Sequence, residues 1–224
     1  MKKILGFVLI TFIICPFAPL ITENQAAEAT TENLQLVKKG RHRELLLDTL
    51  ANWRGYSKFQ LDKASVEFRK NWALDQRNRS GNRPTEQDME AVKASLADLL
   101  GEVLTSELSK NGTLTLTENS GENVMRITPH VVDLDVYAPD RMRAHIGFSL
   151  TDSNGHMTLV LEIHDSVNGA LLARASDFRE DPRQGFLEWT TSVNNRRAAR
   201  LMLIRWAKNV NKWLEEARDG DFDS

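Results

Sequence analysis

Two stretches of the chain repeat their apolar residues at the three- and four-residue steps of an amphipathic helix. The first begins after Thr85, whose hydroxyl can cap a helix, and Asp88 in the third helical position completes a variant of the capping box. Its apolar stripe is Met89, Val92, Leu96, Leu99, Val103 and Leu104. Lys110 and the Asn111-Gly112 pair provide the stop. The pattern predicts a long helix with one apolar face.

The second amphipathic stretch covers residues 193–218, after the candidate caps Thr191 and Ser192. Its apolar residues are Ala199, Met202, Trp206, Val210, Trp213 and Ala217. The sequence DGDFDS (219–224) follows as an acidic tail, which is typical of a frayed terminus. We expect this helix to lay its apolar face on the rest of the domain.

Elsewhere the apolar period is two, which is the period of a strand with one buried face. The alternating segments are YSKFQLDKASVEFRKNW (56–72), TLTLTE (113–118), VMRITPHVVDLDVY (124–137), RMRAHIGFSL (141–150), HMTLVLEIHDSV (156–167) and ALLARASDF (170–178). Pro129 must bend its strand, form a bulge or confine the strand to an edge. These patterns predict an α+β fold: an antiparallel sheet of about five to six strands, packed on one face by the two long helices as a two-layer sandwich.

The N-terminal half has weaker patterns. Residues 30–40 are polar and indicate a linker, and HRELLLDTLANW (42–53) predicts a short helix. RNRSGNRP (77–84) predicts a basic loop. The single globular domain is therefore expected to cover residues 56–218, after a linker and short helix over residues 30–55.

The stretch EIHDSVNGALLARASD (162–177) raises the question of whether His164 and Asp165 form a reactive pair. A two-residue Asn-Gly turn would place Ile163 opposite Arg174. A three-residue loop over residues 167–169 instead pairs Ile163 with Ala173, which puts apolar residues on one face. Burial favours this second register, because a one-residue slip exchanges the two faces of a strand.

The favoured register needs Gly169 in the left-handed conformation at a bulge. It also brings Leu161 opposite Ala175. Asp165 can then accept backbone N–H groups at the turn, while His164 shares the polar face with Glu162 and Arg174. Because neighbouring residues of a strand point in opposite directions, the pair predicts a turn rather than an active site.

The N-terminus has the layout of a bacterial secretory signal. Two lysines precede an apolar run, and small residues in Ala27-Glu28-Ala29 match a signal-peptidase site. We therefore expect residues 1–29 to be removed and the protein to be exported, periplasmic or envelope-associated, with no transmembrane span afterwards. Retention of this segment as an anchor stays open. Lipidation at Cys15 is disfavoured because the bulky Ile14 precedes it.

Composition excludes several classes of function. Cleavage after Ala29 leaves 224 − 29 = 195 residues without the single cysteine, which excludes disulfides and thiol chemistry. The formal net charge of −2 gives no global attraction to nucleic acid or to an anionic membrane. A chain of this length can form one domain without a covalent or metal staple.

No motif for catalysis or for a cofactor stands out. The five histidines, His42, His130, His145, His156 and His164, lack the spacing of a metal site. Asp133 and Asp135 share one strand face, but a solvated polar face explains them better than a glycosidase pair. The chain contains no nucleophile elbow, phosphate-binding glycine loop or dinucleotide fingerprint. We therefore expect no cofactor, no metal and no catalytic residue.

The candidate partner-binding residues are Arg196, Arg197 and Arg200. They lie in the first turns of the last helix, where the helix dipole disfavours cations. One explanation is pairing with carboxylates such as Glu180 or Asp181. The other is a contact surface for an anionic partner.

The order of these segments resembles a family of bacterial envelope proteins, domain of unknown function 3313. The resemblance covers most of the chain after Tyr56 and is carried chiefly by the Asp-Ser-Val-Asn-Gly turn at residues 165–169 and by Trp206-Ala207. Members of that family are commonly predicted lipoproteins, and this chain departs from that pattern. The resemblance implies an envelope address and assigns no catalytic residue.

The sequence thus favours a non-catalytic envelope module that binds or scaffolds a partner, which is an envelope protein or an anionic envelope polymer. The alternative is a hydrolase with an unrecognised active site. An enzyme is expected to have a closed pocket with convergent polar groups, and a binding module an exposed patch or a free sheet edge.

Overall fold

The computed structural model describes residues 33–80, 83–110, 113–136, 150–151, 156–180, 188–189 and 192–220. The helices along these residues are η2 (Trp53–Gly55, a 3-10 turn), α1 (Trp72–Ser80), α2 (Glu86–Leu108) and α3 (Ser192–Asp219). The strands are β1 (Leu34–Gly40), β2 (Arg43–Asp48), β3 (Lys58–Leu61), β4 (Ser65–Phe68), β5 (Thr115–Leu116), β6 (Val124–Asp135), β7 (Leu150–Thr151), β8 (His156–Asp165), β9 (Leu171–Glu180) and β10 (Glu188–Trp189).

Eight of these strands form one sheet in the order β1-β2-β9-β8-β6-β3-β5, with β4 also paired to β6. The α+β class is confirmed, but the expectation of a purely antiparallel sheet with five to six strands is wrong. Strand β6 runs antiparallel to β8 and parallel to both β3 and β4. The physical reason is the connection through α1 and α2, because such a crossover returns the chain in its original direction.

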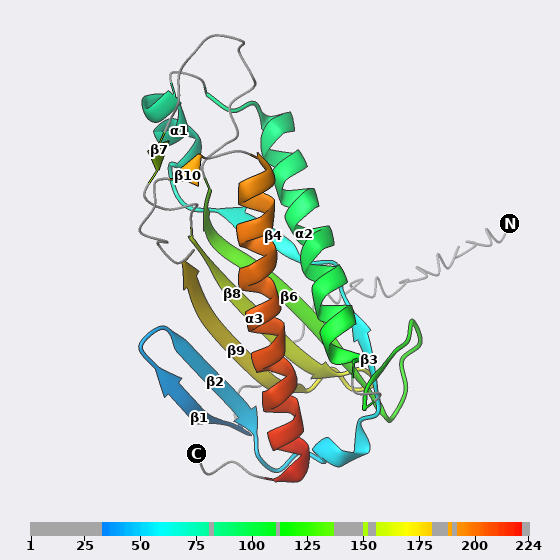
Figure 1. Cartoon of the computed structure of the whole chain (residues 1–224). Coiled ribbons are helices and arrows are strands. Elements are labelled where there is room, and N and C mark those ends of the chain that lie inside the picture. Colours follow the sequence, from blue (N-terminus) through cyan, green and yellow to red (C-terminus); the bar gives the residue numbers. More distant parts are fainter. Residues whose placement is uncertain are drawn as a thin grey trace, which may run out of the picture.

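Helices α2 and α3 run side by side across one face of the sheet, as Figure 1 shows. Both begin at the end of the molecule that holds α1, and α3 ends at the opposite end. The capping box of α2 is present, since the Asp88 N–H donates to Thr85 Oγ1 over 3.1 Å and the Thr85 N–H donates to Asp88 Oδ2 over 3.0 Å. With α2 and α3 on one face of the sheet, the structure has the predicted two-layer arrangement.

The core lies between the two helices and the sheet. Its fully enclosed side chains come from strands β3, β6 and β8 and from both long helices. The side chains with no exposed surface are Phe59, Leu100, Leu104, Met125, Ile127, Val131, Leu159, Leu203, Trp206 and Ala207. Most of the predicted apolar stripes of α2 and α3 are buried here, so the helical periodicity was a sound guide.

The predicted linker and short helix before residue 56 are wrong. This segment forms the β1–β2 hairpin, and β2 pairs with β9 so that Leu45 faces Ala175 and Leu47 faces Ala173. Both leucines are 3% exposed. Short apolar runs do not distinguish a helix from a strand, and pairing with a distant strand decided this one.

The predicted basic loop over residues 77–84 is also partly wrong, because residues 77–80 belong to α1. This helix has little apolar periodicity. It is held in place by the buried side chains of Trp72 and Gln76, each of which donates a hydrogen bond to the Val136 carbonyl. The predicted strand over residues 141–150 lies outside the described residues, except for Leu150 in β7.

Pro129 lies in the long central strand β6 rather than at an edge. Its neighbour on one side is Leu161 of β8. On the other side, β3 pairs with residues up to Ile127 and β4 pairs from His130 onward. The proline therefore faces the break between β3 and β4, where its missing N–H is not required.

Candidate functional site

The outward face of α3 carries a run of cations. Between residues 197 and 212, the described side chains of this helix that are exposed are those of Arg197, Arg200, Leu201, Arg205, Lys208 and Lys212. At 3.6 residues per turn the five cations fall within about 140° of the helix circumference and extend over about 22 Å. We call Arg197, Arg200, Arg205, Lys208 and Lys212 the basic stripe.

Few carboxylates neutralise this stripe. Arg200 lies 3.6 Å from Glu102 of α2, and Lys212 lies 3.6 Å from Glu216 one turn later. Both cations are more than half exposed, and such surface pairs contribute little. The other three cations have no ion-pair partner within the part of the chain that the structure describes. The stripe is thus an open positive surface.

The neighbouring helix has the opposite character. The exposed charged residues of α2 are Glu86, Glu90, Asp98 and Glu102, all of them acidic. Acidic residues in the first turn of α2 suit its helix dipole, whereas Arg197 and Arg200 lie in the first half of α3, toward its positive end. A small net charge therefore conceals two parallel faces of opposite sign.

Two of the three predicted site residues can be placed in detail. Arg197 and Arg200 are exposed, and Arg200 pairs with Glu102 of α2. Arg196 belongs to α3, but its side chain and those of Glu180 and Asp181 lie outside the described set. Arg205, Lys208 and Lys212 were not predicted as site residues, although their spacing opposite the apolar stripe is a usable signal.

The histidine–aspartate pair of the β8–β9 hairpin is a turn, as predicted. Ile163 faces Ala173, Leu161 faces Ala175, and Gly169 has φ +73°. The loop is one residue longer than predicted, because the Asp165 N–H donates to the Ala170 carbonyl over 2.9 Å, while the Asp165 carbonyl accepts the Gly169 N–H over 3.0 Å. The loop therefore has four residues, 166–169.

A bulge restores the predicted core register in β9. Ile163 pairs with Ala173 while the next residue, His164, pairs with Leu171, which leaves Leu172 as the extra residue. All three residues 171–173 are buried. The preference for burial therefore predicted the side-chain pairs of the core correctly, but the predicted loop was one residue too short.

The carboxylate of Asp165 accepts hydrogen bonds that stabilise the turn. Its Oδ1 accepts the N–H groups of Val167 and Asn168 over 2.9 and 3.0 Å, and its Oδ2 accepts the Tyr56 hydroxyl over 2.7 Å. Burial alone raises the pKa of Asp165, but these three donors hold it below its ordinary value. Burial, and then the bond to Asp165, raise the pKa of Tyr56 well above normal. His164 lies beside Glu162 on the polar face, 3.6 Å away.

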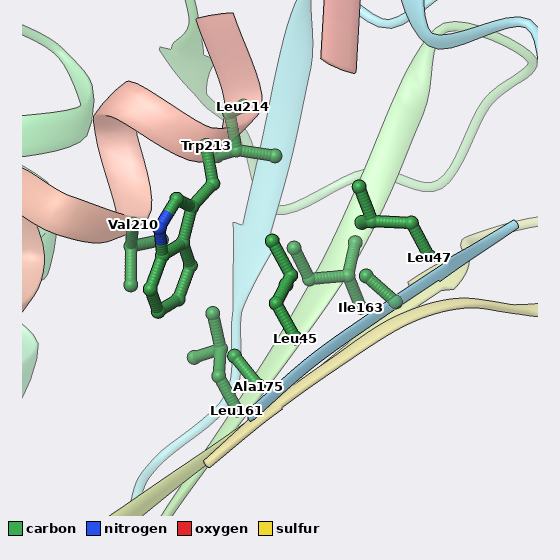
Figure 2. Close-up of a pocket in the computed structure, with 9 residues that line it drawn as sticks. Leu45, Leu47, Leu161, Ile163, Ala175, Val210, Trp213 and Leu214 are labelled. Carbon is green, nitrogen blue, oxygen red and sulfur yellow. The ribbon is translucent and has the colours of Figure 1, made fainter. Parts of the chain in front are cut away.

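The concave feature beneath the end of α3 is a packing defect (Figure 2). It lies between α3 and the paired strands β2, β8 and β9. Its lining is apolar: Leu45, Leu47, Leu161, Ile163, Ala173, Ala175, Val210, Trp213 and Leu214. Its volume is about 10 Å³, room for one water-sized sphere without polar partners. This space is too small for a ligand.

The described residues contain no candidate metal site and no candidate membrane-spanning helix. Across the described ranges, no group of three or more histidine, cysteine or acidic side chains is arranged to hold a metal ion. Asp135 forms an ion pair with Arg69, and Asp133 has φ +53° at an irregular point of β6. None of the helices in the described segments is long and apolar enough to cross a bilayer.

Comparisons with known proteins give weak likenesses. No family model matches the chain, and no curated protein matches it. Protein XCC0632 from Xanthomonas campestris, described as DUF330, is 14% identical, with 74% of this chain and 87% of that one covered and a TM-score of 0.43.

Two other solved structures are similar at a lower score. The PelC dodecamer from Paraburkholderia phytofirmans is 11% identical over 69% of this chain and 88% of that one, with a TM-score of 0.35. A neuraminyllactose-binding hemagglutinin homolog from Helicobacter pylori is 11% identical over 74% and 89%, also at 0.35. These values carry no argument about function, and the resemblance to domain of unknown function 3313 stays a hypothesis.

Proposed function

We propose that this protein is a non-catalytic binding module of the bacterial cell envelope that holds an anionic partner, an envelope protein or envelope polymer, on the basic stripe. The observation that carries the proposal is the run of five exposed cations along about four turns of one helix face. A chain with a net charge of −2 has concentrated these cations where a partner can reach them.

The helix that bears the stripe is firmly anchored. The opposite face of α3 places Trp206, Ala207 and Val210 in the core, each 1% exposed or less. The cations are therefore presented on a rigid element, which lowers the ordering cost of binding. Arg197 and Arg200 lie beyond the first turn of α3, so the helix dipole disfavours them only weakly, and the exposed pair with Glu102 contributes little to stability. A role in recognition accounts for this placement.

The test replaces the three cations that have no described partner. We expect Arg197→Gln/Arg205→Gln/Lys208→Gln to abolish capture of the partner from bacterial envelope extracts while leaving thermal unfolding unchanged or slightly improved. The matched control, Lys39→Gln/Lys58→Gln/Lys63→Gln, removes the same charge from exposed positions elsewhere. Raising the salt concentration should mimic the stripe variant in the wild type, because the Debye length is about 10 Å at 0.1 M.

Two outcomes contradict the proposal. If both variants lose capture equally, total charge matters and the stripe does not. If the stripe variant unfolds at a clearly lower temperature, the cations serve the fold instead.

The envelope address has its own test. The signal at residues 1–29 supports export, and we expect the exported protein to begin at Thr30. Intact-mass measurement of the protein recovered from the envelope fraction checks this. Recovery of a form acylated at Cys15, or of the uncleaved chain, would contradict it.

A further inference from the structure

A groove separate from the basic stripe lies at the end of the molecule where α1 and α2 begin. It is formed by the end of β4, by α1 and by the first two turns of α2, and its volume is about 540 Å³. Volumes of roughly 300–1,000 Å³ are usual for ligand sites. The binding function proposed for the basic stripe does not involve this groove.

The frame of the groove is rigid. Arg69 holds two carboxylates, with Nε 2.6 Å from Asp135 and Nη1 2.6 Å from Asp75. The ring of Phe68 stacks on Trp72 with 4.0 Å between centroids, and the Trp72 indole donates to the Val136 carbonyl over 2.8 Å. These contacts tie β4, α1 and the end of β6 together, so the groove is preformed.

The backbone around the groove is strained. Among the described residues, the only non-glycine residues with positive φ are Asn71, at +63°, and Asp133, at +53°. Asn71 lines the groove, and Asp133 lies two residues from Asp135 of the frame. Strained residues concentrate where the surrounding structure enforces a geometry for binding.

The lining combines an apolar floor with the cations Arg83 and Lys93, and it also contains one carboxylate, Glu67. Leu74 is 48% exposed, and Phe68 and Met89 are half-buried beside it. Arg83 has no ion-pair partner within the described segments. Lys93 lies 2.8 Å from the exposed Glu90, and an incoming carboxylate can replace Glu90 in this pair at little cost. The groove therefore fits a short segment that carries an apolar side chain between carboxylates.

The chain contains such a segment. Its last six residues, DGDFDS (219–224), place Phe222 between Asp221 and Asp223. We propose that this segment docks into the groove of a second copy of the protein, with Phe222 on the apolar floor and its aspartates beside Arg83 and Lys93. The claim is independent of the partner proposed for the basic stripe.

The segment cannot reach the groove of its own chain. Helix α3 has 28 residues, about 42 Å at 1.5 Å per residue, and it starts at the groove end of the molecule (Figure 1). Phe222 lies three residues after Asp219 and can reach at most about 11 Å beyond it. The donor is therefore another copy.

The end of α3 is fixed, so the segment leaves from a defined point. Gly220 has φ +78° and ends the helix, while Arg54 donates from Nε to the Arg218 carbonyl over 2.6 Å and from Nη2 to the Asp219 carbonyl over 3.2 Å. Because donor and acceptor surfaces differ, copies associate either as a dimer with reciprocal exchange of this segment or head-to-tail in rings or chains.

Sedimentation velocity over a range of concentrations tests the assembly. We expect the wild-type chain to self-associate and a variant that ends at Asp219 to remain monomeric. Phe222→Ala and Arg83→Glu/Lys93→Glu should each weaken association by about tenfold or more. Leu74→Asp should do the same, and its exposed position spares the fold.

A labelled peptide of residues 219–224 tests the site directly. By fluorescence anisotropy it should bind the variant that ends at Asp219, and lose about tenfold or more of its affinity when Arg83 and Lys93 are reversed. A peptide of the same composition in scrambled order is the control. The variant Arg197→Gln/Arg205→Gln/Lys208→Gln should bind the peptide normally, so failure here is separable from failure of the proposed function.

Three results overturn the inference. They are a wild-type chain that is monomeric at every concentration, association that persists without residues 220–224, and equal binding of the scrambled peptide.

Discussion

Two regions of this molecule reach similar order by different means. The hairpin of β8 and β9 is local: its strands are joined by a four-residue loop, and its left-handed residue is Gly169. The crossover region, which we define as β4, α1 and the end of β6, joins segments far apart in sequence. Its left-handed residues, Asn71 and Asp133, are not glycines. The hairpin follows local preference, whereas the crossover region depends on distant contacts to impose an unfavourable backbone.

Ion pairs show the same difference, and breaking them should have the largest effect. Arg69 is 22% exposed and holds Asp75 and Asp135, so Arg69→Ala leaves two carboxylates without their cation. We expect a loss of about 2–3 kcal/mol in the free energy of unfolding, less than for a fully enclosed pair because Asp75 is more than a third exposed. Urea unfolding measures this.

The matched change in the hairpin is Arg174→Ala. Arg174 is 51% exposed and lies 3.7 Å from Glu162, so we expect a loss of about 0–1 kcal/mol. Equal losses in the two variants would show that the regions do not differ in this respect.

The turn of the hairpin should be sensitive to a single backbone change. Gly169→Val forces a β-branched residue into φ +73°, and we expect a loss of about 1–2 kcal/mol. No atom lies within 4 Å of the position that a Cβ would take, so the loss is conformational and not steric. Gly101→Ala in α2 is the control, since it also meets no atom and should stabilise by about 0.5–1 kcal/mol. Thermal unfolding distinguishes the two.

The strain of the crossover region should be relieved by the opposite substitution. Asn71→Gly removes the Cβ at φ +63°, and we expect a gain below about 1 kcal/mol, because glycine also loses more entropy on folding. A loss of stability would show that the Asn71 side chain contributes more than its backbone costs. The melting temperature is the readout.

The smallest expected effect is a pH dependence confined to the hairpin. The folded pKa of Asp165 is lowered, so its contribution to stability is present above the unfolded pKa of about 3.9 and is lost as pH falls through the folded value. Tyr56→Phe removes one of the donors that lower it. The difference in unfolding free energy between wild type and Tyr56→Phe should shrink below pH 4. A difference that is constant with pH would contradict this account.

The predictable parts of the fold are those whose signals are local. The capping box at Thr85, the apolar stripe of α3 and the burial preference of Ile163 and Ala173 each lie within one element or one hairpin. The β1–β2 hairpin was not predicted, because Leu45 and Leu47 show their strand character only when paired with β9. The parallel pairing of β3 and β4 was not predictable either, since nothing local specifies the direction of a crossover.

The candidate site was predicted in part for a similar reason. Arg197 and Arg200 drew attention by opposing the helix dipole, an effect limited to the first turns. Arg205, Lys208 and Lys212 share the same face further along, and they stand out only once the buried side of α3 is known. The groove was missed entirely, because Leu74 of α1, Met89 of α2 and Arg83 between the two helices converge only in three dimensions.

The pairing of β2 with β9 has a consequence for how the chain acquires its structure. Leu45 pairs with Ala175, 175 − 45 = 130 residues later, so the inner edge of β2 has no partner strand until most of the protein has been made. At synthesis rates of about 5–20 residues per second this interval is about 7–26 s. During that time an unpaired strand edge with two leucines is open to association with other chains. This edge of the sheet therefore cannot be closed until the C-terminal half of the chain is available.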